Sequence, residues 1–150
     1  MAGSLRVRVI AVGRVKERGI REAIDDYAKR IGRHARFEEV ELKDGSADEV
    51  RARFDKAIGD RSRVVALEVD GKALSSRGLA DYVARCEGDS ISELAFLVGG
   101  AYGLPKETSR AADLRLSLSA MTLPHRLCRL FLVEQVYRAF TIVRNEPYDH

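Results

Sequence analysis

Apolar positions along this chain follow two periodicities, one typical of strands and one typical of helices. Alternating or continuous apolar runs predict strands at residues 5–12, 37–42, 64–69, 91–98 and 114–118. Helical spacing predicts helices at residues 19–31 and 48–58, from Ser75 or Ser76 through Cys86, in a short piece from Pro105, and from His125 onward. Strands that alternate with helices in this way predict an α/β fold with a mainly parallel sheet and helices on both faces. We expect a single domain over residues 1–150.

The last predicted helix differs from the others because its apolar residues do not fit on one stripe. They are Leu127, Leu130, Phe131, Leu132, Val133, Val136, Tyr137, Phe140, Ile142 and Val143. A helix that is apolar nearly all round must be buried on two sides. We therefore expect its second side to form a subunit contact or to enclose a site.

The segment between the last strand and this helix, residues 119–124, is uncharged and mostly apolar. Connections between strands and helices are usually polar and lie on the surface. We expect this one to be buried, with its backbone groups bonded to another chain segment or to a ligand. An ordinary packed loop is the alternative.

Glycines follow the fourth predicted strand directly, in the run Gly99-Gly100-Ala101-Tyr102-Gly103. Glycines at the carboxyl end of a parallel strand let a ligand approach the backbone, and α/β proteins bind ligands at such strand ends. The spacing is not that of the dinucleotide-binding fingerprint, and a tight turn without a ligand is the alternative. The residues together predict a ligand pocket between 99–103 and 119–124.

Charge is distributed unevenly, although the formal net charge is only +3. Ten Lys and Arg residues stand against four acidic residues up to Arg36. Such a cluster is typical of a surface that binds a phosphate backbone, and an ordinary solvated surface is the alternative. The chain shows neither a signal peptide nor a run long enough to span a membrane, so we expect a cytoplasmic protein.

Several kinds of chemistry lack support in the sequence. His125 and Cys128 are three residues apart, but no other histidine or cysteine has ligand spacing, so we expect no metal. Neither cysteine lies in a nucleophile motif. Glu134 and Arg138 have the spacing of a structural ion pair on the last helix, although Arg138 could instead face a ligand.

The chain resembles the RlmH group of SPOUT methyltransferases over essentially its full length. The resemblance lies in LRVRVIAVGRVKE, LEVDGKALSS, FLVGGAYGL, LSLSAMTLPHRLCRLFLVEQVYRAF and the tail RNEPY. It implies a C-terminal trefoil knot, and it implies methylation of N3 of a pseudouridine in 23S (large-subunit) ribosomal RNA, on the assembled ribosome. It also implies a homodimer joined through the last helix, in which each active site takes a catalytic tail from the partner subunit.

The resemblance further implies which residues serve S-adenosylmethionine and the acceptor base. Contacts to S-adenosylmethionine fall on Leu67, Gly99, Gly100, Ser119, Ala120, Met121, Thr122, Leu123 and Pro124. The catalytic candidates, which would hold or deprotonate the acceptor base, are Arg138, Tyr148 and His150, with His125 as a weaker fourth. The basic N-terminal third would hold the RNA.

The tail departs from the family pattern. The family tail usually reads Tyr-His after a proline or alanine, whereas this chain ends in Pro147-Tyr148-Asp149-His150. Either His150 or Asp149 could take the place of the family's histidine. The altered tail also leaves a second hypothesis open, a non-catalytic RNA-binding or ribosome assembly factor with the same fold.

Overall fold

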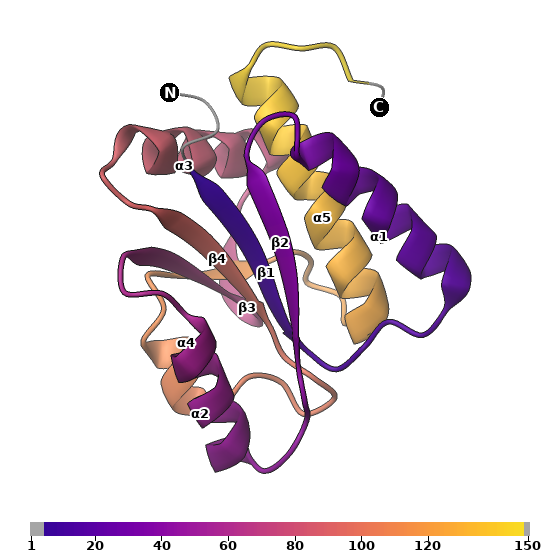
Figure 1. Cartoon of the computed structure of the whole chain (residues 1–150), viewed down its shortest axis with the longest axis vertical. Coiled ribbons are helices and arrows are strands. Elements are labelled where there is room, and N and C mark those ends of the chain that lie inside the picture. Colours follow the sequence, from indigo (N-terminus) through magenta and orange to yellow (C-terminus); the bar gives the residue numbers. More distant parts are fainter. Residues whose placement is uncertain (1–4, 149–150) are drawn as a thin grey trace.

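A five-stranded parallel sheet forms the centre of the computed structural model, which describes residues 5–148 (Figure 1). Its strands lie in the order β2-β1-β4-β3-β5, and every neighbouring pair is parallel. Every residue of β4 is buried, as expected for a strand that is covered on both faces. The predicted α/β fold is confirmed. The bounds are β1 (Arg6–Val12), β2 (Arg36–Leu42), β3 (Ser62–Ala73), β4 (Glu93–Val98) and β5 (Leu114–Ser117).

Helices cover the two faces unequally. On one face lie α1 (Arg18–Ile31), α3 (Ser76–Gly88) and α5 (His125–Val143), with α5 packed against both of the others. On the other face lie α2 (Ala47–Ala57) and the short α4 (Lys106–Arg110), which contact each other. Successive strand residues point to opposite faces. Val9 accordingly belongs to the larger core cluster under α1, α3 and α5, and Ile10 to the smaller one under α2.

Local sequence signals explain where several helices begin. Ser46 forms a capping box with Glu49 at the start of α2, because each side chain accepts a hydrogen bond from the other's backbone N–H. Ser75, one of the two predicted caps, accepts the N–H of Gly78 at the start of α3. Pro124 precedes α5, where its fixed φ suits the first helical turn.

One predicted boundary is wrong. Asp70 and Gly71 read as a turn after the third strand, but β3 continues to Ala73 and pairs again with β5. The register shifts between Leu67 and Lys72, so the dipeptide forms an irregularity within the strand. A Cβ on Gly71 would lie 2.7 Å from the carbonyl carbon of Arg115. Glycine is therefore required by the close approach of β5.

The expected burial of the C-terminal region is only half present in the single subunit. The inner side of α5 is fully buried, but on its outer side Leu127 is 40% exposed and Phe131 39%. The segment 119–124 is mostly exposed, with Met121 at 78%, so the prediction that it is buried is wrong for the single subunit. Residues 5–148 therefore leave part of the apolar surface in these two places uncovered. The C-terminal trefoil knot stays a prediction.

None of the helices within residues 5–148 is long and apolar enough to cross a membrane.

Candidate functional site

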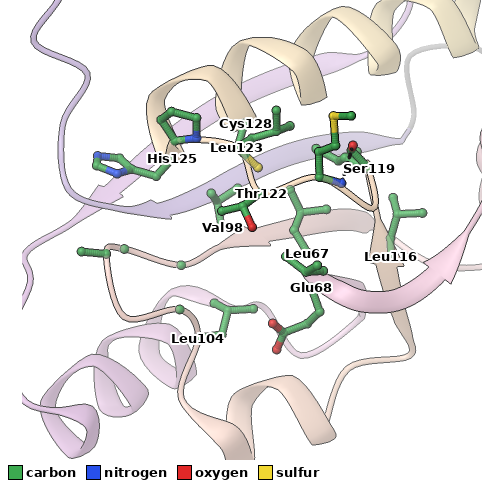
Figure 2. A pocket seen from close by; sticks show the side chains of 18 residues that line it. Leu67, Glu68, Val98, Leu104, Leu116, Ser119, Thr122, Leu123, His125 and Cys128 are labelled. Atoms are coloured by element: carbon green, nitrogen blue, oxygen red, sulfur yellow. Dashed lines mark hydrogen bonds between the residues drawn. The ribbon is translucent and has the colours of Figure 1, made fainter.

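A cavity of about 530 Å³ lies at the carboxyl ends of β4 and β5, beside the irregular part of β3 (Figure 2). Leu67 and Glu68 of β3 form one wall, and the glycine loop after β4, residues 99–103, continues it. Thr122 and Leu123, from the segment after β5, lie across the cavity from Glu68 in this view. The size is within the usual range for small-molecule sites, and strand ends are the usual place for them in α/β folds.

Eight of the nine predicted cofactor residues line this cavity, and Ala120 does not. The eight are Leu67, Gly99, Gly100, Ser119, Met121, Thr122, Leu123 and Pro124. Residues that the sequence did not single out complete the wall, among them Glu68, Leu116 and Cys128. Glu68 directly follows the predicted Leu67, where the pairing of β3 with β5 becomes irregular.

Close packing within the glycine loop requires glycine at two positions. A Cβ on Gly99 would lie 2.4 Å from the carbonyl carbon of Gly103, and Gly103 itself has φ +81°. The N–H of Gly103 donates to the carbonyl of Gly100 at 3.0 Å, which closes the turn. The glycines were expected to make room for a ligand. At position 99, the turn's own backbone already excludes a side chain.

Two serines hold the first part of segment 119–124 in shape. The Ser117 hydroxyl donates to the carbonyl of Ser119 at 3.0 Å, and the N–H of Met121 donates to the Ser119 hydroxyl at 2.9 Å. Some of the backbone groups that we expected a ligand or another segment to satisfy are therefore bonded locally. The apolar side chain of Met121 remains at the edge of the cavity.

The first turn of α5 brings His125 and Cys128 to the cavity, and Figure 2 labels both. Burial raises the pKa of the Cys128 thiol to about 11. A thiol with that pKa stays protonated near neutral pH, so Cys128 is not a nucleophile there. His125 is the catalytic candidate that lines the cavity within one subunit.

Arg138 and Tyr148 form a separate cluster with Glu134 further along α5. Arg138 pairs with Glu134 at 2.7 Å, and the Tyr148 hydroxyl donates to the same carboxylate at 2.9 Å. The guanidinium also lies over the Tyr148 ring, 4.6 Å from its centroid. At 1.5 Å per residue, Glu134 is roughly 13 Å along the helix from His125. One subunit therefore does not bring these two candidates to the cavity, and His150 lies outside the described residues.

Burial, together with hydrogen bonds to Tyr27 and Glu134, raises the pKa of Tyr148 above its usual value. Its hydroxyl keeps the proton near neutral pH and can donate a hydrogen bond, but it is no base. The predicted ion pair between Glu134 and Arg138 is confirmed.

Ion pairs occupy half of the basic N-terminal cluster. Arg8 is nearly buried between Glu38 and Glu93, at the edge of the sheet opposite the cavity. The other paired members are Arg6, Arg18, Arg21 and Arg30. Arg14 and Lys16 lie in the exposed connection between β1 and α1, without an ion pair among residues 5–148. The cluster is therefore not a single surface for phosphates.

Histidine, cysteine and carboxylate side chains do not gather as a metal site in the part of the chain that the structure describes.

The fold is a parallel α/β protein with a cavity at its strand ends, and sequence comparison gives the class. A family model described as "Predicted SPOUT methyltransferase" matches residues 5–150. The chain belongs to this family and is a methyltransferase, as predicted.

Curated relatives place the chain within one group of that family. A protein from Sorangium cellulosum is 48% identical over 97% of this chain and 100% of its own length, and one from Geobacter sulfurreducens is 42% identical with the same coverage. Both carry the name "Ribosomal RNA large subunit methyltransferase H". The predicted membership of the RlmH group is confirmed.

A solved structure supports the fold alone. The probable methylase family protein from Haemophilus influenzae Rd KW20 has a TM-score of 0.56 and 14% sequence identity, covering 93% of this chain and 66% of its own.

S-adenosylmethionine is the cofactor of this methyltransferase family, and the cavity suits its chemistry. Leu67, Leu116 and Leu118 would offer apolar walls to an adenine ring. The Glu68 carboxylate can accept hydrogen bonds from ribose hydroxyls or from the ammonium group. The exposed, apolar edge at Met121 would be covered by such a ligand.

Proposed function

We propose that this protein methylates N3 of a pseudouridine in 23S ribosomal RNA, on the assembled ribosome, with S-adenosylmethionine as the methyl donor. One observation carries the proposal. The cavity at the strand ends contains eight of the nine predicted cofactor residues, in a chain whose full-length relatives are named large-subunit ribosomal RNA methyltransferases.

The bound cofactor supplies an electrophilic methyl group on its sulfonium sulfur, so no metal is required. The chain must align the acceptor nitrogen and promote loss of its imide proton. Each pKa unit between that imide and the ambient pH costs about 1.4 kcal/mol. A positive charge or a base beside the imide lowers this cost, and alignment supplies much of the remaining rate.

His125 and Arg138 are the described residues that can meet these needs. His125 lines the cavity and can accept a proton or hold the base. Arg138 carries a permanent charge, and Tyr148, whose hydroxyl stays protonated, acts as a hydrogen-bond donor. His150 remains a proposed member of the same group.

A homodimer would bring Arg138 and Tyr148 of one subunit close to the cavity and His125 of the other. Leu127 and Phe131 on the outer side of α5 are exposed beside a hollow of about 570 Å³ that also contacts Tyr27 and Glu134. Apolar surface of this kind on a helix favours an interface with a second copy. Arg138 and Tyr148 lie near this surface, so we propose that they serve the cavity of the partner subunit. The ribosomal substrate implies a cytoplasmic protein.

Methyl transfer from labelled S-adenosylmethionine tests this function. Purified protein is incubated with free 23S RNA, large subunits and whole ribosomes, and label in the RNA is counted. We expect label with whole ribosomes. Thr122→Trp, at an exposed position on the cavity wall, should abolish cofactor binding by calorimetry and transfer together, with native circular dichroism. Ribosome binding without label on any substrate would instead support the assembly factor.

A further inference from the structure

A second hollow, of about 250 Å³, lies on the other side of the glycine loop from the cofactor cavity. The loop is its shared wall, because Gly100, Gly103 and Leu104 line both spaces. Ala101 lines only the first space and Tyr102 only the second. The backbone of this loop therefore separates the two spaces.

Topology explains why a hollow forms here. β1 and β4 are neighbours, but the chain leaves β1 toward α1 on one face and leaves β4 toward α4 on the other. Diverging connections leave a crevice at the carboxyl ends of the two strands, the preferred binding place in open parallel sheets. Val12 at the end of β1 and Gly100 after β4 line the hollow.

Tyr102 is the most exposed large apolar side chain in the described part of the molecule, at 98%. It lies at the turn of a loop whose other members are packed against one another. An aromatic ring held in water at the edge of a hollow offers a flat surface for stacking. Nucleobases in single-stranded RNA stack on such rings, whatever their sequence.

Asp44 provides a polar group to the hollow, close to the glycine loop. Its Oδ1 accepts the N–H of Gly45 at 2.8 Å, and its Oδ2 lies 3.8 Å from the position that a Cβ would take on Gly100. The Arg53 guanidinium donates to the carbonyls of Lys43 and Asp44, at 3.0 and 3.2 Å, which holds this connection in place. Oδ2 has no hydrogen-bond partner among the described residues, so it can accept one from an exocyclic amino group.

Lysines stand on both sides of the hollow. Lys43 directly precedes Asp44, and Lys106 directly follows Pro105, which lines the hollow. Both are exposed, and within residues 5–148 neither has an ion pair. They are placed to contact phosphates, which position a nucleic acid without reading its sequence.

We propose that this second hollow binds a nucleobase of the ribosomal RNA strand that neighbours the methylated nucleotide. Tyr102 stacks on the base, and Asp44 accepts a hydrogen bond from its exocyclic amino group, which favours adenine, cytosine or guanine over uracil. The base occupies the hollow while its neighbour faces the cofactor across the glycine loop. This assignment rests on the proposed rRNA methyltransferase function.

Steady-state methylation of whole ribosomes at saturating S-adenosylmethionine tests the assignment. We expect Tyr102→Ala to raise KM for ribosomes about tenfold or more, since stacking on an aromatic side chain is worth that much. The value of kcat and the cofactor Kd by calorimetry should not change, because Tyr102 does not line the cofactor cavity. Tyr102→Phe keeps the ring and should retain the wild-type KM.

Asp44→Asn provides a second variant, because its amide oxygen can still accept the Gly45 N–H while its NH₂ group replaces the free acceptor. It should also raise KM with kcat unchanged. An unchanged KM in Tyr102→Ala, an equal loss in Tyr102→Phe, or loss of cofactor binding in Tyr102→Ala would each overturn the assignment.

Co-sedimentation with ribosomes separates this assignment from the proposed function. Wild-type protein that binds ribosomes but transfers no methyl group would contradict the function alone. Weaker binding by Tyr102→Ala than by Tyr102→Phe would then still support the hollow, and equal binding would overturn it.

Discussion

Replacement of Arg129 by methionine should destabilise the protein more than any other single change of charge on α5. The Arg129 side chain is 1% exposed, and it joins α5 to the sheet. Its guanidinium contacts Glu39 at 2.5 Å and Glu41 at 2.9 Å, and it donates to the carbonyl of Gly13 at 3.3 Å. The helix turn that carries it also carries Cys128, so this anchor sets the position of the cavity wall.

The expected loss in the free energy of unfolding follows from the buried carboxylates that methionine would leave without their partner. Removing one partner of a buried ion pair costs about 3–5 kcal/mol. Arg21 still contacts both carboxylates, and Glu41 is one-third exposed, so water and a second cation moderate the loss. We expect about 3 kcal/mol, at the lower end of that range. For a chain of this size, that corresponds to a fall in Tm of roughly 6–12 °C.

Urea unfolding followed by circular dichroism measures this cost at equal protein concentration. Arg126→Met is the matched control, because Arg126 is on the same helix turn but is 41% exposed in its ion pair with Glu17. It should cost less than about 1 kcal/mol. Adding Glu39→Gln to Arg129→Met should recover part of the loss, since the uncompensated carboxylate is removed. Equal costs for Arg129→Met and Arg126→Met would refute the anchoring role.

Three further predictions follow from burial and close packing. Burial lowers the pKa of His34, so below about pH 6.5 the unfolded state binds a proton more readily than the folded state, and the free energy of unfolding decreases as the pH is lowered. His34→Phe should flatten this part of a urea-unfolding pH series, and an unchanged slope would contradict the prediction. Gly99→Ala should displace the glycine loop and weaken cofactor binding in calorimetry, whereas Gly88→Ala, whose Cβ meets nothing within 4 Å, should be neutral or slightly stabilising; similar effects of the two would show that the loop tolerates a Cβ. Phe131→Glu should shift the protein from dimer to monomer in analytical ultracentrifugation with native circular dichroism, and a persistent dimer would move the interface away from α5.

Local periodicity predicted nearly all of the helices and strands, because each face of this sheet is covered and its strands read as apolar runs. Asp70-Gly71 was read wrongly since a turn and an irregularity within a strand share the same local residues. What distinguishes them is the approach of Arg115, which is 44 residues away and carries no local signal. The burial of segment 119–124 was predicted wrongly for a similar reason. Composition does not tell whether an apolar loop is covered by its own chain or by another molecule.

Resemblance to a family located the cofactor residues, whereas the residues alone indicated only a pocket between two segments. Glu68 was missed because nothing in its immediate sequence marks it as a pocket residue. The hollow with Asp44 and Tyr102 was missed for a different reason. Its two sides come from connections that follow β2 and β4, and only the strand order brings them together.

Mass spectrometry of 23S ribosomal RNA tests the central claim most directly. Ribosomes from cells that lack this protein are incubated with the purified protein and S-adenosylmethionine, and the digested RNA is compared with an untreated sample. The account predicts one added methyl group, located on N3 of a pseudouridine, which appears with wild-type protein and is absent with Thr122→Trp. RNA of unchanged mass after incubation with a protein that binds the cofactor, or a methyl group on another kind of nucleotide, would contradict it.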